Sequence, residues 1–262
     1  MSVDQNQVPF LLLPNWLGLP VGVRALSTTR NGGTSLPPYD GGSCGGKRST
    51  GNGFNLGEHV GDDINHVLAN RAALESYIEV PVTFLSQIHG NIAIDADDWR
   101  PGIEADAVVS TRSKQVCAIQ TADCLPVLFA AKNGRVVGAA HAGWRGLAAG
   151  VLQNTVKAMR QRGADEITAW LGPAIGPASF EVGKEVKDEF EAVLSQVNHC
   201  FTPHGEAKYL ANLYALARVA LQTVGVVEVT GGEYCTYSDH QRFYSYRRDR
   251  VTGRMASLIW RE

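Results

Sequence analysis

The sequence of 262 residues contains no apolar run close to the roughly 18 to 20 residues that a membrane-spanning helix needs. Its most apolar N-terminal stretch, "PFLLLPNW" at residues 9–16, is short and bounded by prolines. That stretch also lacks the basic start and the small-residue cleavage site of a signal peptide, so we expect a first strand there. The chain is therefore not predicted to have a membrane partner.

Cysteines are few and form no recognisable pattern. The chain has 5 of them, an odd number, and none lies in a CxxC spacing. Such a pattern fits neither a disulfide framework nor a zinc knuckle, and a chain of this length can bury a core without covalent links. We expect free thiols and a cytoplasmic location.

Charge of one sign is not concentrated anywhere. The 24 basic and 26 acidic residues leave a net charge of -2, and the lysines and arginines are scattered. No basic stripe predicts binding to nucleic acid or to an anionic membrane. Internal repeats and coiled-coil heptads are also absent. The architecture must therefore come from alternating strands and helices.

Short runs rich in valine, isoleucine and alanine predict the strands. They lie at residues 9–16, 21–29, 82–90, 105–110, 116–131, 135–143, 166–172 and 226–232. Several runs are apolar on both faces, which is typical of sheets covered on both sides.

Helical periodicity predicts four helices, at residues 64–78, 146–163, 183–194 and 208–225. The mixture indicates one α/β or α+β domain over residues 1–262, and periodicity alone does not choose between the two. Residues 242–254 alternate aromatic and basic side chains, which predicts a strand and a hairpin turn at Thr252 and Gly253. The glycine-rich residues 40–54 predict a flexible loop.

Three side chains that can bind metals lie near the ends of predicted strands: His89, Cys124 and His141. They are 35 and 17 positions apart (124 − 89 and 141 − 124), so only the fold could bring them into one site. A thiolate and two imidazoles form a ligand set for catalytic zinc, in which a fourth position stays open. The alternative is that each is an ordinary core or surface group.

Arg145 follows His141 in "AAHAGWRG", where a strand should turn into a helix beginning near Gly146. Free backbone N–H groups at a helix start and a bidentate guanidinium suit a phosphate or carboxylate. Arg145 could instead pair with a nearby carboxylate such as Asp123.

Two rival chemistries use the same atoms. Cys124 could act as a nucleophile activated by His89 or His141, and metal binding would compete for the same sulfur lone pair. Copper oxidation of phenols meets an obstacle, because the 7 histidines include no HxH pair and cannot fill the copper clusters of ordinary laccases.

Six blocks of the sequence resemble the YfiH family, also known as a polyphenol-oxidase or laccase-like family. They are "SQIHG", "TADCLPVLF", "AAHAGWRG", "WLGPAIGP", "NLGEHVGDD" and "FYSYRRDRVTGRMASLIW". The resemblance runs from about residue 8 to the C-terminus. One departure is the glycine-rich segment, which adds residues where the family passes almost directly to the "NLGxH" block.

The resemblance implies a four-layer αββα fold with mixed sheets, similar to the catalytic domain of a cytotoxic necrotising factor. It implies zinc, with copper as the other candidate metal, held by His89, Cys124 and His141. Purine nucleosides and phosphate are the implied partners of a monomer or small homo-oligomer. Adenosine, inosine and methylthioadenosine would be phosphorolysed to base and ribose 1-phosphate sugar, and adenosine would also be deaminated.

The expected catalytic residues are His89, Cys124, His141 and Arg145. Arg145, Asn55, Gln87 and Asp123 are the expected substrate and phosphate contacts. For the proton shuttle of deamination we consider Asp123 and Glu181.

Overall fold

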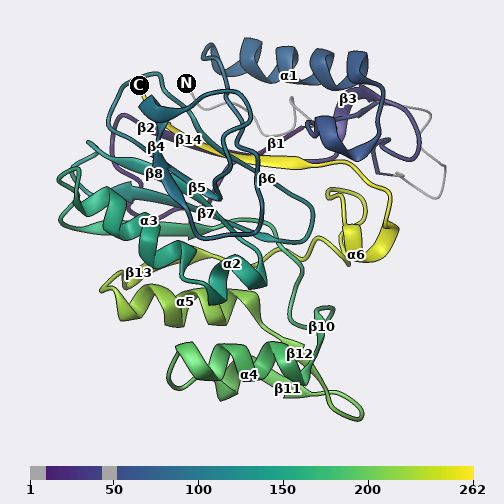
Figure 1. The fold of residues 1–262 in the computed structure, drawn as a ribbon. Coiled ribbons are helices and arrows are strands. Elements are labelled where there is room, and N and C mark those ends of the chain that lie inside the picture. The colour runs from purple at the N-terminus through teal and green to yellow at the C-terminus, as the bar shows by residue number, and fades with distance from the viewer. Residues whose placement is uncertain (1–9, 43–51) are drawn as a thin grey trace.

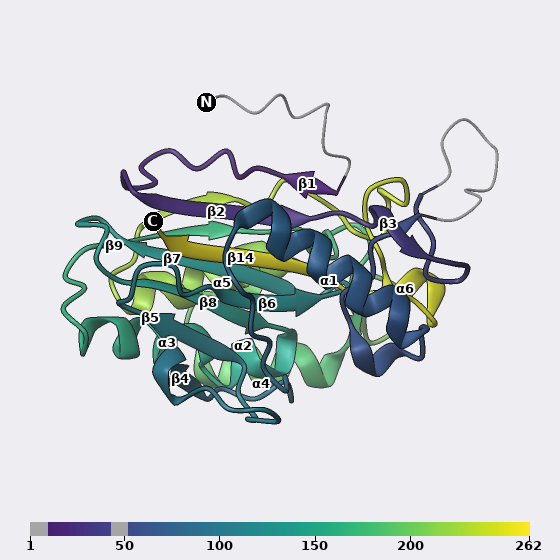
Figure 2. The ribbon, with the colours of Figure 1, turned by 90° about the horizontal axis from the view of Figure 1, so that it is seen from above.

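The fold consists of four layers, helix, sheet, sheet and helices, in a computed structural model that describes residues 10–42 and 52–262. Helix α1 (Ile64–Ile78) lies across the outer face of a four-stranded sheet, as Figure 2 shows from above. A six-stranded sheet packs beneath the first, and helices α2, α3 and α5 cover its far face (Figure 1). These helices span Trp144–Ala148, Val151–Arg160 and Leu213–Thr223. The predicted αββα single domain with mixed sheets is confirmed, whereas the likeness to a cytotoxic necrotising factor stays an expectation.

The four-stranded sheet has the order β1-β2-β14-β6 and is antiparallel throughout. Its strands are Leu11–Leu12, Val23–Thr28, Met255–Arg261 and Cys117–Thr121. The six-stranded sheet has the order β13-β9-β7-β8-β5-β4, with parallel pairs at both edges and antiparallel pairs between them. Its strands are Glu228–Gly231, Ile167–Leu171, Leu125–Ala131, Val137–Ala142, Ala107–Ser110 and Ala93–Asp95.

Smaller elements flank these layers. A three-stranded sheet β10-β12-β11 packs with α4 below α5 (Figure 1). These elements are Glu181–Gly183, Lys208–Ala211, Phe201–Pro203 and Lys184–Val193. The remaining ones are β3 (Asn31–Ser35), α6 (Tyr246–Asp249) and 3-10 turns at Glu58–Val60, Ala96–Asp98 and Asn198–Cys200.

Burial explains the apolar strand runs. All seven residues of β7 are buried, because one face packs on the four-stranded sheet and the other on the helices. Ala25 and Ile259 meet Leu128 and Ala139 between the two sheets. Each buried face of a strand removes apolar area from water, and each Å² of that area stabilises the fold by about 25 cal/mol.

Several predicted boundaries differ from those of the structure. The run 116–131 forms two strands, β6 and β7, in different sheets, because the chain crosses between layers at residues 122–124. The helix expected at 146–163 forms two helices, α2 from Trp144 and α3 from Val151. Gly150, with a φ of 88°, separates them. Residues 208–225 start as strand β12 before α5 begins.

Three other strand predictions differ from the structure. Residues 82–90 form a loop whose only ladder contact is the bridge of Ser86 with Glu104. Residues 242–254 contain helix α6, capped by Ser245, in place of a hairpin strand, and the strand β14 follows them. In the described part of the first run, residues 10–16, only Leu11–Leu12 is a strand.

Residues 43–51 of the expected loop at 40–54 lie outside the described residues, so its flexibility stays a prediction. At its described ends, the Gly42 N–H donates to Asn31 Oδ1 over 2.8 Å, and Phe54 is buried and stacks on Phe10. In the described part of the chain, no helix has the length and apolarity to cross a bilayer. Its four cysteines, Cys117, Cys124, Cys200 and Cys235, are free thiols.

Candidate metal centre

His89, Cys124 and His141 come together at one end of the six-stranded sheet. Their candidate donor atoms all lie within 4.8 Å of one another, and no other described group of histidine, cysteine and acidic residues is arranged to hold an ion. The two imidazole rings meet edge to face, with centroids 4.8 Å apart. Residues far apart in the chain therefore form one cluster, as the sequence prediction required.

The strand register explains this convergence. Strands β7 and β8 pair antiparallel with Leu125 opposite Ala142, so the start of β7 meets the end of β8. Cys124 immediately precedes β7, and His141 is the next-to-last residue of β8. Antiparallel pairing of adjacent strands places the beginning of one beside the end of the other.

Asp106 joins both histidines of the cluster from inside the protein. It immediately precedes β5, is fully buried, and its Oδ1 lies 2.8 Å from His141 Nδ1. The same carboxylate accepts hydrogen bonds from the backbone N–H groups of Ile88, His89 and Gly90, at 3.2, 2.9 and 2.7 Å. Asp106 thus orients one imidazole directly and anchors the loop that carries the other, as partners of metal-binding histidines do.

The loop of His89 is constrained in a backbone conformation that is uncommon for a residue with a side chain. His89 has a φ of 62°, in the left-handed region. The three N–H bonds to Asp106 oppose the cost of this conformation, which is of order 1 kcal/mol or more. A carboxylate that accepts several N–H bonds is stabilised in its charged form.

Space around the cluster depends on a glycine. A Cβ at Gly143 would lie 2.9 Å from Cys124 Sγ and 3.3 Å from His89 Cδ2. Only a residue without a side chain leaves both groups where they are. Gly143 also ends the strand that carries His141 and precedes helix α2, which confirms the predicted strand-to-helix corner.

The three ionisable groups of the cluster shift one another's protonation. Burial opposes ionisation of Cys124, but the charge and hydrogen bonds of His141 and His89 outweigh it and lower the pKa of the thiol to about 6. Burial likewise opposes protonation of His141, but the Cys124 thiolate and Asp106 raise its pKa to about 9. Burial would raise the pKa of Asp106, yet its hydrogen bonds with His141 and Gly90 hold it below its ordinary value.

The cluster opens into a cavity of about 680 Å³. This volume falls within the range of small-molecule sites. The lining consists of His59, Leu85, Ser86, Gln87, His89, Gln120, Thr121, Ala122, Cys124, His141, Tyr246 and Arg254. No carboxylate is among these described residues.

Of the other residues predicted from sequence, Gln87 lines the cavity but uses its amide elsewhere. Its Oε1 accepts from the Gln120 N–H and its Nε2 donates to the Gln120 carbonyl, both at 2.8 Å. Gln87 therefore pairs with the edge of β6 as a backbone group would. This pairing holds the loop that carries His89 against the four-stranded sheet.

Asn55 and Asp123 are buried outside the cavity lining, where each accepts hydrogen bonds from distant segments. Asn55 Oδ1 accepts from the N–H groups of Gly57 and Arg254, at 2.9 and 2.8 Å. The carboxylate of Asp123 accepts from Thr236 Oγ1 at 2.6 Å and from the Arg247 N–H at 2.6 Å. Both join segments distant in sequence around the cavity.

Arg145 and Glu181 also lie outside the lining. Arg145 is exposed on α2, with its guanidinium carbon 4.4 Å from the centre of the Trp144 ring. It makes no ion pair with Asp123, whose oxygens bond other groups. Glu181 pairs with Lys208 at 2.6 Å on the small sheet.

Gln120, Tyr246 and Arg254 are among the lining residues that sequence reasoning did not single out. The signal for Arg254 was present, because it stands immediately before strand β14. A polar residue at the end of an apolar strand is the same pattern that singled out Cys124 and His141.

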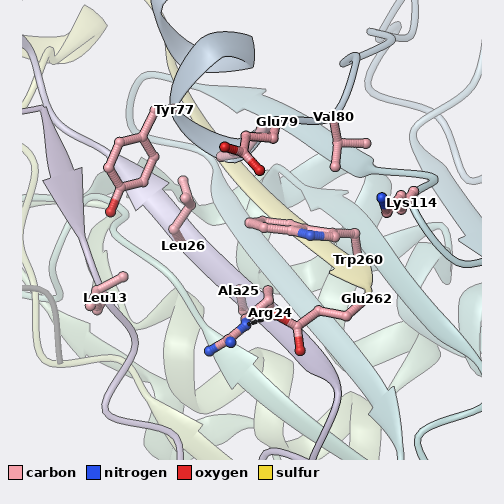
Figure 3. A pocket seen from close by; sticks show the side chains of 11 residues that line it. Leu13, Arg24, Ala25, Leu26, Tyr77, Glu79, Val80, Lys114, Trp260 and Glu262 are labelled. Atoms are coloured by element: carbon pink, nitrogen blue, oxygen red, sulfur yellow. Dashed lines mark hydrogen bonds and ion pairs between the residues drawn. The ribbon is translucent and has the colours of Figure 1, made fainter. Parts of the chain in front are cut away.

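A second cavity, of about 760 Å³, lies on the outer face of the four-stranded sheet (Figure 3). Trp260, Leu26 and Tyr77 line it, and Arg24 and Glu262 pair at its edge over 2.6 Å. Its described lining contains neither histidine nor cysteine. No group of three or more described ligand side chains that could hold an ion lies on this larger cavity.

A family model described as "multi-copper polyphenol oxidoreductase laccase" matches residues 24–262. A protein of Escherichia coli named purine nucleoside phosphorylase YfiH is 47% identical over 253 residues, which cover 95% of this chain and 98% of that protein. This chain belongs to the YfiH family. A YfiH-family relative of Pseudomonas aeruginosa, also named a purine nucleoside phosphorylase, is 47% identical over 250 residues, covering 95% of this chain and 97% of its own length.

Solved structures agree with this family assignment. A crystal structure from Neisseria meningitidis matches with a TM-score of 0.86 and 44% identity, covering 97% of this chain and 99% of that one. The Bacillus licheniformis protein YfiH matches with a TM-score of 0.86 and 30% identity, covering 98% of each chain. The YfiH fold thus accounts for the described part of the chain.

Proposed function

We propose that this protein is a zinc-dependent purine nucleoside phosphorylase. The observation that carries the proposal is the cluster of His89, Cys124 and His141 on a cavity large enough for a nucleoside. The names of relatives at 47% identity support the reaction class.

The donor set fits zinc. One thiolate and two imidazoles are common zinc ligands, with bonds of about 2.0 to 2.3 Å, and three protein ligands leave a fourth position open. Asp106 occupies His141 Nδ1, so Nε2 is the nitrogen free to bind. The space beside Gly143 admits all three donors. When bound, zinc would act as a Lewis acid in the cavity.

In phosphorolysis, a phosphate oxygen forms a bond to the anomeric carbon of the ribose. The bond from that carbon to the purine nitrogen breaks, and its electron pair leaves with the base, which then takes up a proton. The chain's own contribution is to hold the two reactants in line, because positioning removes much of the entropic cost of a bimolecular step. Tyr246 and Leu85 offer the purine an aromatic and an apolar surface.

Adenosine, inosine and methylthioadenosine are the proposed substrates, and adenosine deamination is the proposed side activity. Zinc deaminases use a glutamate to carry protons. Neither Asp123 nor Glu181 lines the cavity. Deamination here would therefore rely on another proton carrier. We propose His59 for this role, because its imidazole lines the cavity near Arg254 and lies outside the metal cluster.

Two alternatives have specific support. The low pKa of the Cys124 thiol beside His141 favours a cysteine hydrolase. The description of the matching family favours phenol oxidation with copper in the same cluster. Both would use Cys124, so they compete with zinc for one sulfur.

The test is a metal analysis of the freshly purified protein, followed by nucleoside turnover with and without phosphate. We expect about one zinc per chain and ribose 1-phosphate release that requires phosphate and is lost in Cys124→Ala. Unchanged release in that variant would refute the mechanism. Hydrolysis that survives chelation but not alkylation would favour the hydrolase, and phenol oxidation in proportion to bound copper would favour the oxidase.

A further inference from the structure

The cavity beside the His89, Cys124 and His141 cluster has an excess of positive charge. The charge is that of Arg254, because burial and the nearby Arg254 and Arg71 lower the pKa of His59, which lines the cavity as an imidazole donor. The described lining includes no aspartate or glutamate. Cavities lined by charge of one sign attract ligands of the opposite sign. The chemistry of the lining therefore indicates an anion.

Arg254 has unused donors that face no protein carboxylate. Its Nη1 donates to the carbonyls of Thr252 and Gly253, at 3.2 and 3.1 Å. Nε and Nη2 make no hydrogen bond with the described residues. No carboxylate of the described residues forms an ion pair with this half-buried guanidinium. The anionic groups that most favour its charged form are Cys124 and Asp123. Asp123 is already bonded to Thr236, Ser245 and Arg247.

The backbone holds Arg254 and His59 side by side. Asn55 Oδ1 accepts from both the Gly57 and the Arg254 N–H groups, and the Leu56 N–H donates to the Arg254 carbonyl over 3.1 Å. A Cβ at Gly57 would lie 2.7 Å from Arg254 Cγ, so the arginine stem lies directly on this glycine. His59 follows two residues later. The buried Asn55 thus holds the segments that carry the Arg254 guanidinium and the His59 imidazole in place before any ligand arrives.

We propose that Arg254 and His59 form an oxyanion subsite that binds inorganic phosphate beside the His89, Cys124 and His141 cluster. This inference rests on the proposed function, and it names the residues that hold its second substrate. A planar guanidinium with free donors suits a phosphate bidentately, and an imidazole adds one further donor. The role expected for Arg145 from sequence passes to Arg254.

The test compares five variants of the full-length, metal-loaded protein: Arg254→Gln, Arg254→Lys, His59→Gln, Arg145→Gln and Arg135→Gln. Binding of inorganic phosphate is measured by calorimetry, and the phosphate and nucleoside KM values are measured in phosphorolysis. Arg135 is an exposed arginine on the turn between β7 and β8 and serves as the surface-charge control.

We expect Arg254→Gln to weaken phosphate binding and raise the phosphate KM about tenfold or more, with the nucleoside KM changed less than twofold. Arg254→Lys should recover part of the loss. His59→Gln should weaken phosphate binding about threefold, and it decides the matter if Arg254→Gln does not fold, because His59 is exposed. Arg145→Gln should match the Arg135→Gln control.

Wild-type phosphate affinity in both Arg254→Gln and His59→Gln, or a loss in Arg145→Gln alone, would overturn the subsite. If wild-type protein still releases ribose 1-phosphate in that case, the proposed function stands. If wild-type protein neither binds phosphate nor needs it for turnover, both fail. Adenosine 5′-monophosphate serves as a competitor, and tighter binding of this nucleotide than of inorganic phosphate at Arg254 would also count against the proposal.

Discussion

Asp106→Asn tests the link between the buried carboxylate and the metal cluster most directly. The carboxylate has four hydrogen-bond partners: Oδ2 accepts from the N–H groups of Ile88 and Gly90, and Oδ1 accepts from His89 and faces His141 Nδ1. Asparagine replaces one of these oxygens with an NH2 group, which cannot accept. Either orientation of the amide leaves donors facing donors.

The two orientations have different consequences. If NH2 replaces Oδ2, two backbone N–H groups of the loop that carries His89 lose their acceptor. If it replaces Oδ1, His141 must shift its proton from Nδ1 to Nε2, which removes the lone pair that would bind zinc. Each unmade buried hydrogen bond costs about 1 to 3 kcal/mol. We therefore expect a loss of about 2 to 4 kcal/mol in the free energy of unfolding of the metal-free protein.

Zinc affinity should fall about 10- to 100-fold, the usual effect of removing the partner of a metal-binding histidine. Competition with a chromophoric chelator at pH 7.5 measures this affinity, and urea unfolding measures stability. The matched control is Asp62→Asn, because Asp62 is also a buried acceptor, bonded to Ser35 Oγ at 2.7 Å and Asn55 Nδ2 at 2.9 Å. The control should lose stability and keep zinc. Wild-type zinc affinity in Asp106→Asn would refute the reasoning.

Three further predictions follow from particular contacts. Gly143→Ala adds a methyl group 2.9 Å from Cys124 Sγ and should lower zinc affinity about tenfold in the chelator assay, so an unchanged affinity would contradict the spatial role of this glycine. In the metal-stripped protein, iodoacetamide should modify Cys124 at a rate that rises with pH through about 6 and is flat above pH 7, since the pKa of its thiol is about 6 and only the thiolate reacts. Peptide mass mapping should find Cys117 unmodified, because burial raises the pKa of that thiol. A midpoint near 8.5 for the modification of Cys124 would show that His141 does not stabilise the thiolate. Ser245→Ala removes the cap of α6 and should lower the free energy of unfolding by about 1 to 2 kcal/mol in urea, with little effect expected if the cap bond to the Arg248 N–H were absent.

Much of the fold could be predicted from local sequence. The strands around residues 107–110, 137–142 and 167–171 and the helix at 64–78 follow from apolar pattern and capping. These elements are buried on defined faces, so side-chain pattern and burial agree. Asp63 caps α1 by accepting from the Asn65 N–H over 2.8 Å, and the periodicity of this helix ends at Ile78 as expected.

The failures at residues 82–90 and 116–131 share one cause, which is that partners distant in sequence override local preference. Residues 82–90 have the composition of a strand, but the Asp106 carboxylate captures three of their N–H groups and holds a loop. The apolar run 116–131 looks continuous, yet it turns between two sheets at Asp123, which has a φ of 89° and bonds to Thr236 and Arg247. No local window contains these partners.

The sequence by itself determined which side chains could do chemistry: two histidines and a cysteine at strand ends, in blocks that resemble one family. Its strand runs that are apolar on both faces also indicated sheets covered on both sides, whereas the four-layer order was implied only by the family resemblance. Only the tertiary structure decided which candidates meet. Antiparallel register brings Cys124 to His141, whereas Arg145 stacks on Trp144 outside the cavity and Arg254 takes a place in its wall. The physical reason is that a site is defined by distances in space, and strand register and hydrogen bonds between distant segments set those distances.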